Sequence, residues 1–309
     1  MLIETLRTLA EQTIPADCVL LDNGSSDGSV ARVERELPEV RIVKLGSNLG
    51  FGPALNEGVR RYPADLLVFA NNDVLYEPRF LECLLDAGGS GDVTAAGVLL
   101  TQNDSGIIDS AGVVVDKTLL GSDYLHGEPI EEAMTAASPL GPTGAAALVP
   151  LSAFRSVGGF DDRIFAYLED VDLALRLLAI GVRCRLAPEA RGRHRHSATL
   201  GSGSDEKNRL MGWSRGYILR RYGVMREPRL AARALATEVV ICAGQLAIDR
   251  TTSGMIGRLR GWQAGRALPR RAVPPDAAAE LSLAEALRRR AVRRRPVRTA
   301  SDRGPSGRR

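Results

Sequence analysis

The sequence predicts an α/β fold in which helices cover a mostly parallel central sheet. Two short apolar runs, residues 18–21 and 66–70, have the composition of buried strands, and residues 41–45 alternate like a half-buried strand. Helical patterns fill the intervals between them, at residues 29–36 and 52–61. This alternation is typical of a parallel sheet with covering helices, and ligands bind such sheets at the carboxyl ends of the strands.

The composition is that of an ordinary globular protein. The chain has 309 residues, of which 44% are hydrophobic and 25% charged. The cysteines lack paired spacing, which favours reduced thiols over a zinc site or disulfides: Cys18, Cys83, Cys184 and Cys242. The N-terminus lacks a secretory pattern, and the best candidate membrane span, residues 235–248, is too short. These observations predict a cytoplasmic protein.

The positive charge is concentrated near the C-terminus. Residues 266–309 contain thirteen arginines against four acidic residues, a net charge of +9 within a total of +4. With few large apolar residues, residues 269–309 are predicted to be mostly disordered. Such a segment is attracted to anionic membrane surfaces, whereas nucleic acid is a less favoured partner because no aromatic side chain is present to stack on a base. A solvated terminus without any partner is the remaining interpretation.

Polar side chains follow two of the predicted strands. Asp22 begins a turn after the first strand, and Asn71-Asn72-Asp73 follows the third. A divalent cation such as Mg²⁺ needs only one or two protein oxygens when water and phosphates complete its shell, so Asp73 is a candidate ligand. Turn and helix-capping chemistry explains both segments equally well when each is taken alone.

A third acidic group opens a helix. Residues 169–172 precede an apolar stripe with the i, i+3, i+4, i+7 spacing of a packed helix. A carboxylate in such a rigid first turn can be held against a substrate hydroxyl, so Asp170 is a candidate general base. Asp172 is expected to pair with Arg176 at i+4. For an isolated acid at this place, interaction with the helix dipole is the simpler explanation.

Two of the three histidines lie in one basic segment, residues 191–197. Histidines in a basic loop are as readily solvated as bound to a ligand. Both interpretations apply to His194 and to the alternative His196. The neighbouring arginines suit a diphosphate.

Several motifs occur in a characteristic order between residues 1 and 222. They are Asp22-Asn23-Gly24-Ser25-Ser26-Asp27-Gly28-Ser29, Asn48-Leu49-Gly50-Phe51-Gly52 with Asn56 and Gly58, Phe69-Ala70-Asn71-Asn72-Asp73-Val74, Gly144-Ala145-Ala146, Gly158-Gly159-Phe160-Asp161 and Leu168-Glu169-Asp170-Val171-Asp172-Leu173. Jointly these motifs resemble those of the family 2 glycosyltransferases with the GT-A fold, especially their bacterial rhamnosyltransferase-like branch. None of them is specific by itself.

The resemblance implies an inverting transfer of a sugar from a nucleotide-diphosphate donor. Asp170 matches the catalytic base of the family, and Asp73 with His194 matches the ligands of Mg²⁺ or Mn²⁺ at the donor diphosphate. Asn71 stands at the first position of the metal motif, which gives the cation one negative charge fewer. The positions that match donor-binding residues are Asp22, Asn48, Gly50, Asn56, Asn71 and Asn72. The positions assigned to the acceptor side of the cleft are Gly144, Gly159 and Glu169.

One departure from the family concerns its first strand. The family begins with an apolar strand and a polar loop that precede the helix represented here by residues 2–12. That strand would be central in the sheet, so its absence predicts unpaired backbone groups there. A translation start assigned too far downstream is the favoured explanation, and a degenerate homologue with impaired donor binding is the alternative.

The chain is predicted to have three parts. These are a catalytic domain at residues 1–224, a helical extension at residues 225–268 and the arginine-rich tail at residues 269–309. In the extension, residues 228–248 and 255–268 have helical patterns. The second is a basic amphipathic helix with Trp262 that suits a membrane interface, and ordinary packing on the domain explains it equally well.

Together these observations predict a metal-dependent inverting glycosyltransferase of cell-surface polysaccharide synthesis. The expected donor is dTDP-rhamnose, and the expected acceptor is a glycan or a lipid-linked glycan at the inner face of the plasma membrane. The main alternative is a non-catalytic homologue that binds a sugar nucleotide or a glycan. Nucleic-acid binding through the tail is weaker, as is nucleotidyl transfer, because no glycine-rich phosphate loop with a lysine precedes the first acidic motif.

Overall fold

The computed structural model describes residues 1–88, 93–195 and 203–279. The N-terminal elements are α1 (Leu2–Ala10), β1 (Val19–Asp22), α2 (Ser29–Glu36), β2 (Arg41–Lys44) and α3 (Phe51–Arg61). The central elements are β3 (Leu66–Ala70), β4 (Val74–Tyr76), α4 (Phe80–Gly88), β5 (Val93–Thr101), β6 (Ile108–Ser110), β7 (Val113–Val115), β8 (Gly121–Asp123), β9 (Ala146–Pro150), α5 (Leu151–Ser156), α6 (Glu169–Ala179) and β10 (Arg183–His194). The C-terminal helices are α7 (Asp205–Arg221), α8 (Pro228–Gly244) and α9 (Ser253–Ala264).

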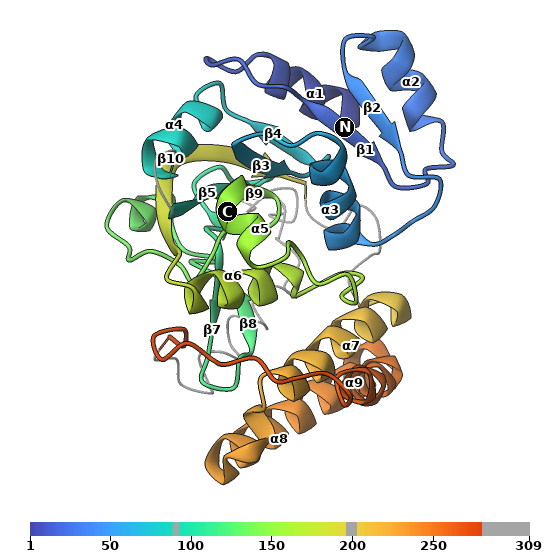
Figure 1. The fold of residues 1–309 in the computed structure, drawn as a ribbon, viewed down its shortest axis with the longest axis vertical. Helices are drawn as coiled ribbons and strands as arrows, with labels where there is room; N and C mark the ends of the chain where they lie inside the picture. Colours follow the sequence, from blue (N-terminus) through green and yellow to red (C-terminus); the bar gives the residue numbers. More distant parts are fainter. Residues whose placement is uncertain (89–92, 196–202, 280–309) are drawn as a thin grey trace, which may run out of the picture.

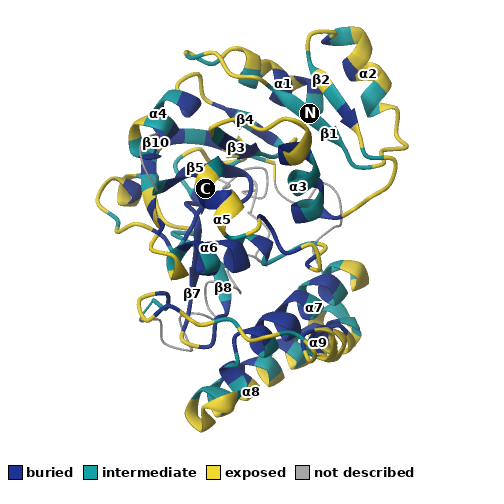
Figure 2. Ribbon diagram, in the orientation of Figure 1, coloured by how far each residue is buried: buried dark blue, intermediate teal, exposed yellow. Residues whose placement is uncertain are grey.

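The molecule is built around a central mixed sheet. In Figure 1, the β1–β2 pair with α1 and α2 lies at the top, the central sheet lies in the middle, and α7, α8 and α9 form a bundle below it. The main core packs α4 against β4, β5, β9 and β10, around side chains such as Phe80, Leu84 and Leu148. Strands β5 and β9 are buried along most of their length, whereas the outer side of α8 is exposed (Figure 2).

The α/β class is confirmed, but the strand pairing differs from the expected mostly parallel pattern. The central sheet has the order β3-β9-β5-β10-β4, with β6 also paired to β5. Only β5 and β10 run parallel in this sheet, and the other neighbours are antiparallel. The difference arises because β9 enters between β3 and β5 after a long excursion through β6, β7 and β8, a pairing that hydrophobic periodicity does not encode.

The first elements of the chain follow the predicted pattern closely. The helix expected at residues 29–36 is α2, and the helix expected at residues 52–61 is α3, which begins one residue earlier. Gly28 precedes α2 with a φ of 77°, and the Ser29 N–H donates to Asp27 Oδ1 (3.0 Å). Local turn chemistry is therefore sufficient to start this helix.

An apolar cavity separates the β1–β2 pair from the central sheet. Strand β1 pairs with β2 and strand β3 pairs with β9, so within the described ranges the facing edges of β1 and β3 have no ladder partner. The cavity between them has a volume of about 440 Å³ and is lined by apolar side chains from α1, β1 and β3. The unpaired backbone groups expected from the sequence lie at these two edges.

Glycines bring α7 and α9 into close contact. Gly212 and Gly216 of α7 face the backbone of α9, and Gly257 and Gly261 of α9 face the backbone of α7. A Cβ atom at any of these four positions would overlap backbone atoms of the other helix. The two helices therefore pack at a distance that only glycine permits.

Helix α8 is attached to the rest of the protein by buried ion pairs. Arg233 pairs with Asp116 (3.0 Å), and Glu238 pairs with both Arg215 (2.7 Å) and Arg258 (2.5 Å). By length and hydropathy, Pro228–Asp249 is the one described segment that could cross a membrane, which differs from the sequence estimate that no stretch was long enough. In this structure the ion pairs hold one face of this segment against the domain.

Residues 269–279, which the sequence assigns to the tail, pack on the protein. Ala277 is buried in a core shared by β7, α6, α7 and α8, and the Ala279 N–H donates to the Val115 carbonyl (2.8 Å). This segment is fixed by long-range contacts, which its proline-rich composition does not reveal. The rest of the predicted disordered tail, residues 280–309, and the alternative His196 lie outside the described residues.

We expect Gly261→Ala to destabilise the protein and Gly244→Ala to leave it unchanged or slightly more stable. The new methyl group at Gly261 meets the backbone of α7, and such overpacking costs about 1–3 kcal/mol. At Gly244, in the last turn of α8, a Cβ meets nothing within 4 Å, and replacing a helical glycine gains roughly 0.5–1 kcal/mol. Urea unfolding of both variants checks this, and equal stabilities would contradict the tight α7–α9 packing.

Candidate active site

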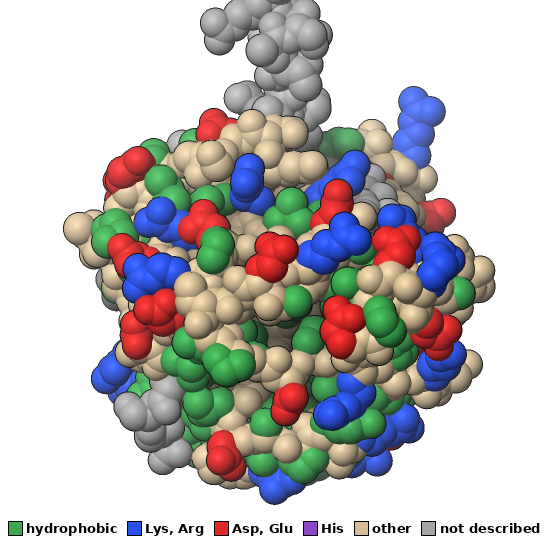
Figure 3. Space-filling view, turned by 90° about the horizontal axis from the view of Figure 1, so that it is seen from above, with side chains coloured by type: hydrophobic (Ala, Val, Ile, Leu, Met, Phe, Trp, Pro, Cys, Tyr) green, Lys and Arg blue, Asp and Glu red, His purple; other side chains and the backbone are tan. Residues whose placement is uncertain are grey.

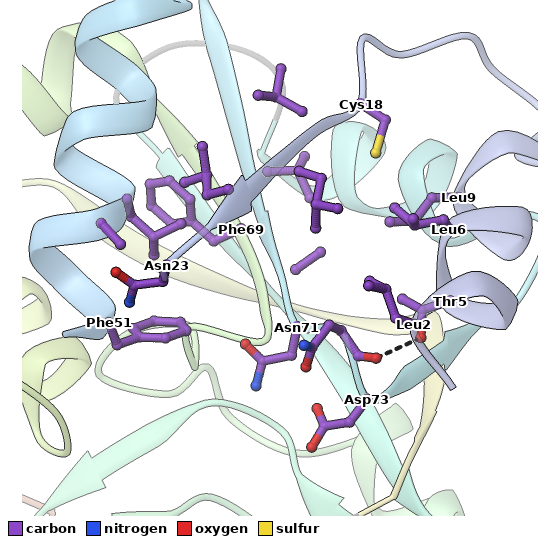
Figure 4. A pocket seen from close by; sticks show the side chains of 18 of the residues that line it. Leu2, Thr5, Leu6, Leu9, Cys18, Asn23, Phe51, Phe69, Asn71 and Asp73 are labelled. Atoms are coloured by element: carbon purple, nitrogen blue, oxygen red, sulfur yellow. Dashed lines mark hydrogen bonds between the residues drawn. The ribbon is translucent and has the colours of Figure 1, made fainter. Parts of the chain in front are cut away.

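The Asn71-Asn72-Asp73 turn lies at one end of the cavity, between β3 and β4. The backbone of each residue is bonded to another element, namely Asn71 N–H to Tyr76 Oη (2.9 Å), Thr5 Oγ1 to the Asn72 carbonyl (3.1 Å) and Arg195 N–H to the Asp73 carbonyl (2.9 Å). Figure 4 shows the Asn71 and Asp73 side chains grouped at this polar end, away from Leu6, Leu9 and Cys18 at the apolar end. The turn is thus held rigidly while its side chains stay available.

His194 faces Asp73 because β4 and β10 pair in antiparallel register. His194 lies opposite Val74, and its Nε2 atom is 3.4 Å from Asp73 Oδ1. Its Nδ1 atom is 2.7 Å from Oδ2 of Asp109, a buried residue of β6. Burial lowers the pKa of His194, but the neighbouring carboxylates of Asp109 and Asp73 outweigh burial and raise this pKa to about 9. His194 is therefore an imidazolium between two carboxylates.

The atoms around Asp73 fit a divalent cation. Asp73 Oδ1 is buried and makes no hydrogen bond, and the charge that offsets it is the His194 imidazolium at 3.4 Å; a divalent cation would take the place of the histidine proton there. His194 Nε2 would be a second ligand after losing its proton. The described part of the chain contains no group of three or more His, Cys, Asp and Glu side chains placed to hold a metal. Water and phosphate oxygens would complete the shell, as is usual for Mg²⁺.

The predicted donor-binding residues fall into two groups. Gly50, Asn71 and Asn72 line the cavity, whereas Asp22, Asn48 and Asn56 are bonded within the surrounding loops. Asp22 Oδ1 accepts from the Ser25 N–H (2.9 Å), and Asn48 Oδ1 accepts from the Gly50 N–H (3.0 Å). For Asp22, this bond is the turn chemistry that was the alternative explanation.

Asn23 is a cavity-lining residue that sequence reasoning overlooked. Its Nδ2 atom donates to the Gly50 carbonyl (2.9 Å) and to Asn48 Oδ1 (3.1 Å), and its Oδ1 atom accepts from the Leu49 N–H (2.8 Å). Asn23 therefore joins the turn after β1 to the loop before α3. The place of Asn23 inside a recognised motif was a sufficient signal of a role at the site. The role was assigned instead to its neighbour Asp22, because Asp22 carries a carboxylate.

Asn56 and Gly159 lie in contact, and each accounts for the residue type at the other position. Asn56 Nδ2 donates to the Phe160 carbonyl (2.9 Å), and Asn56 Oδ1 accepts from the Phe160 N–H (2.9 Å). Gly159 has a φ of 71°, and a Cβ atom there would lie only 2.5 Å from Asn56 Oδ1. This pair connects α3 to the corner at residues 158–161 that precedes α6. Packing of two segments accounts for both residues.

Glu169, which is buried, and Asp170, which is half-buried, form an acidic pair in the first turn of α6. Asp170 accepts hydrogen bonds from the backbone N–H groups of Val171 (2.8 Å) and Gly144. Burial raises the pKa of both carboxyl groups, and the pKa of each is raised further by a neighbouring carboxylate, Asp170 for Glu169 and Asp123 for Asp170. Glu169 Oε2 is buried and has no hydrogen-bond partner.

A short hydrogen-bonded path connects this acidic pair to the Asn71 turn. It runs from Asp170 to the Gly144 N–H, along the backbone to the Ala145 carbonyl, which accepts from Tyr76 Oη (2.8 Å), and from Tyr76 Oη to the Asn71 N–H (2.9 Å). Gly144 leaves no room for a side chain because a Cβ atom would overlap the ring of Phe51, which lines the cavity. The acidic pair and the Asp73 turn therefore adjoin one region.

Asp109 is the second residue that sequence reasoning missed. It is 5% exposed, and besides His194 it contacts His126, whose Nδ1 atom lies 3.5 Å from Asp109 Oδ1. No motif contains Asp109, although a carboxylate within the apolar segment 107–115 is a signal of a buried, partnered acid. Its position beside His194 depends on the pairing of β5 with β6 and β10.

Comparison with known families and proteins agrees with this geometry. The family described as glycosyl transferase family 2 matches residues 1–107, and the family described as glycosyl transferase family group 2 matches residues 118–262. The crystal structure of GalNAc-T7 with UDP, GalNAc and Mn²⁺ has a TM-score of 0.51 at 14% identity, covering 74% of this chain and 50% of that one. This likeness shows the GT-A fold alone.

Two curated proteins are similar in sequence. An N-acetylglucosaminyl-diphospho-decaprenol L-rhamnosyltransferase of Mycobacterium tuberculosis (strain CDC 1551 / Oshkosh) is 32% identical, over 60% of this chain and 69% of that protein. The O-antigen biosynthesis protein RfbC of Myxococcus xanthus is 28% identical, over 63% of this chain and 16% of that protein. The chain therefore belongs to glycosyltransferase family 2, in its rhamnosyltransferase-like branch.

Proposed function

We propose that this glycosyltransferase is a metal-dependent inverting enzyme that uses a nucleotide-diphosphate sugar. The observation that carries the proposal is the buried, unbonded Oδ1 of Asp73 beside His194, in a region that the Glu169–Asp170 pair adjoins. A cation site next to a buried acid of raised pKa combines the two functions that such a transfer needs. The work of the enzyme lies in cell-wall polysaccharide synthesis, in keeping with its rhamnosyltransferase relative.

Asp170 is the proposed general base. It takes the proton of the acceptor hydroxyl while that oxygen attacks the anomeric carbon on the face opposite the departing diphosphate. The backbone N–H groups of Val171 and Gly144 hold the carboxylate in place, and burial raises its pKa towards the range in which it can accept a proton at neutral pH. Glu169, beside it, belongs to the acceptor side together with Gly144 and Gly159 in this proposal.

Asp73 and His194 are the proposed ligands of Mg²⁺ or Mn²⁺. When bound, the cation would neutralise the negative charge that develops on the leaving diphosphate. Asp109 fixes the orientation of the His194 ring from behind, as a carboxylate commonly does for a ligating histidine. Because Asn71 rather than an acid precedes Asp73 by two residues, the protein contributes little negative charge, which leaves the diphosphate to supply more.

The donor sugar and acceptor follow from the relative's name. That protein is a rhamnosyltransferase acting on a decaprenol-linked N-acetylglucosamine, which supports dTDP-rhamnose as the donor and a glycan or lipid-linked acceptor here. Asn23, Gly50, Asn71 and Asn72 are the cavity-lining residues proposed to face the donor. Asp22, Asn48 and Asn56 would shape the donor site through the loops that they hold.

A second candidate is a non-catalytic protein that binds a sugar nucleotide or a glycan. The cavity that separates β1 from β3 favours it, because the polar end of that cavity is where donor-facing residues lie. A sheet divided next to its ligand site is less well supported than a continuous one. Binding of dTDP-rhamnose without any turnover would identify this function.

Peripheral contact with an anionic membrane is also part of the proposal, through α8 rather than α9. The exposed positions of α8 and the following turn form one apolar stripe: Ala232, Leu235, Ala236, Val239, Val240, Ala243, Leu246 and Ala247. Exposed Arg229 precedes this stripe and exposed Arg250 follows it, and basic residues at both ends suit an anionic lipid surface. By contrast, Trp262, the expected anchor on α9, packs against the core and under the Arg220 guanidinium.

The apolar stripe on α8 is the favoured lipid-binding surface, because the charges on another face of the protein are mixed in sign. The face seen in Figure 3 carries acidic and basic side chains interspersed, without a region of one sign. On α8, Leu235, Val239 and Leu246 are 55%, 66% and 58% exposed. Transfer of such side chains out of water contributes roughly 1.5–3 kcal/mol each when it is complete.

We expect Asp170→Asn to lower the transfer rate by roughly 10²–10⁴-fold while donor affinity changes little, because the amide cannot accept the acceptor's proton. In the unmodified enzyme, turnover should fall as pH drops through a pKa above the usual carboxyl range, since the base is active only when ionised. Steady-state kinetics with dTDP-rhamnose and isothermal titration of the donor check both points. Glu189→Gln, an exposed acid, is the control, and full activity of Asp170→Asn would remove this residue from the role of base.

We expect Mn²⁺ affinity to depend on both carboxylates beside His194, those of Asp73 and Asp109. Asp73→Asn should abolish measurable binding, and Asp109→Asn should weaken it by roughly 10–100-fold because the ring loses its orienting partner. Binding should tighten from pH 6.5 to 8.5, since His194 must lose its proton to ligate and its pKa is about 9. Electron paramagnetic resonance titration of Mn²⁺ measures this, with Asp86→Asn as control; unchanged affinity in Asp73→Asn would contradict the site.

We expect the double variant Val239→Asp/Leu246→Asp to lose at least roughly tenfold in binding to phosphatidylglycerol vesicles, because two apolar side chains no longer enter the lipid. Met134→Asp, at a 54% exposed methionine on a different element, is the matched control. Co-sedimentation with anionic and neutral vesicles measures the effect. A dimer in solution that Val239→Asp dissociates, without vesicle binding, would assign the stripe to a second copy of the chain instead.

A further inference from the structure

The segment after α9, residues 269–279, runs as a strap across the protein. We call it the C-terminal strap. In Figure 1 it leaves α9 and passes below α6 towards β7 and β8. The Arg271 N–H donates to the Arg221 carbonyl (2.7 Å), Ala277 is buried, and the Ala279 N–H donates to the Val115 carbonyl (2.8 Å). The strap is therefore attached to α7 at one end and to β7 at the other.

Arg271 of the strap joins two buried carboxylates. Its Nη2 atom lies 2.8 Å from Asp161 Oδ2, and its Nη1 atom donates to Asp172 Oδ1. The side chains of Asp161 and Asp172 are 2% and 0% exposed. Both acids also accept from tyrosines of α7 and its end, Tyr217 Oη to Asp161 Oδ2 (2.8 Å) and Tyr222 Oη to Asp172 Oδ1 (3.0 Å).

These two acids lie on either side of the segment that presents Asp170. Asp161 ends the corner at residues 158–161, and Asp172 lies in the first turn of α6, two residues after Asp170. The other oxygen of Asp172 accepts from Arg176 Nε (2.8 Å), as the i+4 spacing predicts. Arg271 thus bonds the corner to the helix start, and so does Arg176, whose Nη1 atom donates to the carbonyls of Val157 (2.8 Å) and Gly159 (2.6 Å).

Between the two acids the backbone is strained. Tyr167 and Leu168 have φ values of 67° and 64°, and neither is a glycine. A residue other than glycine held in this left-handed region is strained and persists only when its surroundings determine it. Ser214 Oγ of α7 donates to the Ala166 carbonyl (3.0 Å), which is one such restraint. The Arg271 side chain spans the same turn, because it bonds Asp161 before the turn and Asp172 after it.

We propose that Arg271 is a positioning residue for catalysis: by holding Asp161 and Asp172 together it fixes the strained turn that aims Asp170 at the acceptor. The proposal rests on the role of Asp170 as base. A buried ion pair is often no more stabilising than an apolar replacement, so stability alone does not explain this arrangement. Arg176 bonds Asp172 to the carbonyls of Val157 and Gly159, whereas Arg271 is the cation that joins the Asp161 carboxylate to the Asp172 carboxylate.

The test compares Arg271→Ala with Arg271→Lys and with Arg270→Ala, its exposed neighbour in the strap. We expect Arg271→Ala to lower kcat by roughly 10–100-fold with the donor KM nearly unchanged, because a misplaced base slows the chemical step. Arg271→Lys should have a kcat nearly as low as that of Arg271→Ala, since lysine cannot bridge two carboxylates with one planar fork. Guanidinium ions at low concentration should partly restore kcat, and Arg270→Ala should behave like the unmodified protein.

Hydrogen–deuterium exchange gives a readout that does not need turnover. Amides at residues 163–173 should exchange faster in Arg271→Ala than in Arg270→Ala, while those of β5 and β9 keep their protection. If the unmodified protein shows no transfer, the proposed function fails, but this exchange difference still tests the bridge. If Arg271→Ala does not fold, the charge-balanced pair Arg271→Met/Asp161→Asn is used. Unchanged kcat and unchanged exchange, or a loss of kcat that matches only a loss of folded protein, would overturn the proposal.

Discussion

A carboxylate removed from water needs a cation or several hydrogen-bond donors, and this chain buries several carboxylates at the junctions between its segments. Asp116 is met by Arg233 of α8, Asp172 by Arg176 of its own helix and Arg271 of the strap, and Asp109 by His194 of β10. In all three cases a partner comes from a segment distant in sequence. The attachment of the C-terminal extension to the catalytic part depends on these pairs as much as on the apolar core.

The few acids whose partners are incomplete are the functional candidates. Asp73 Oδ1 and Glu169 Oε2 are both buried without a hydrogen bond, and they belong to the two groups that the proposed chemistry uses. Fully paired acids such as Asp172 support these groups from behind. Burial raises the pKa of Glu169 and Asp170, whereas it lowers that of His194, which two neighbouring carboxylates raise to about 9.

Sequence reasoning predicted local elements well and connections poorly. The helices α2 and α3 and the strand β3 appear at or within one residue of their predicted positions, because periodicity and turn residues act over a few positions. The antiparallel insertion of β9, the contact of Asp109 with His194 and the packing of residues 269–279 all join segments far apart along the chain. None of these leaves a periodic pattern, and the strap even has the composition of a disordered tail.

The order of the motifs was enough to identify the family and to select Asp73, His194 and Asp170 as candidates, because the residue types that bind cations and protons can be read from the chain. Tertiary structure alone decided which of the polar motif residues are available to a ligand. Asp22, Asn48 and Asn56 turned out to be bonded within loops, as is Asn23 although it lines the cavity. The Asn71 and Asn72 side chains line the cavity without bonding to the loops that the structure describes. Availability is decided by which backbone donors and acceptors fold against each side chain, and those come from strand register and long-range packing rather than from local sequence.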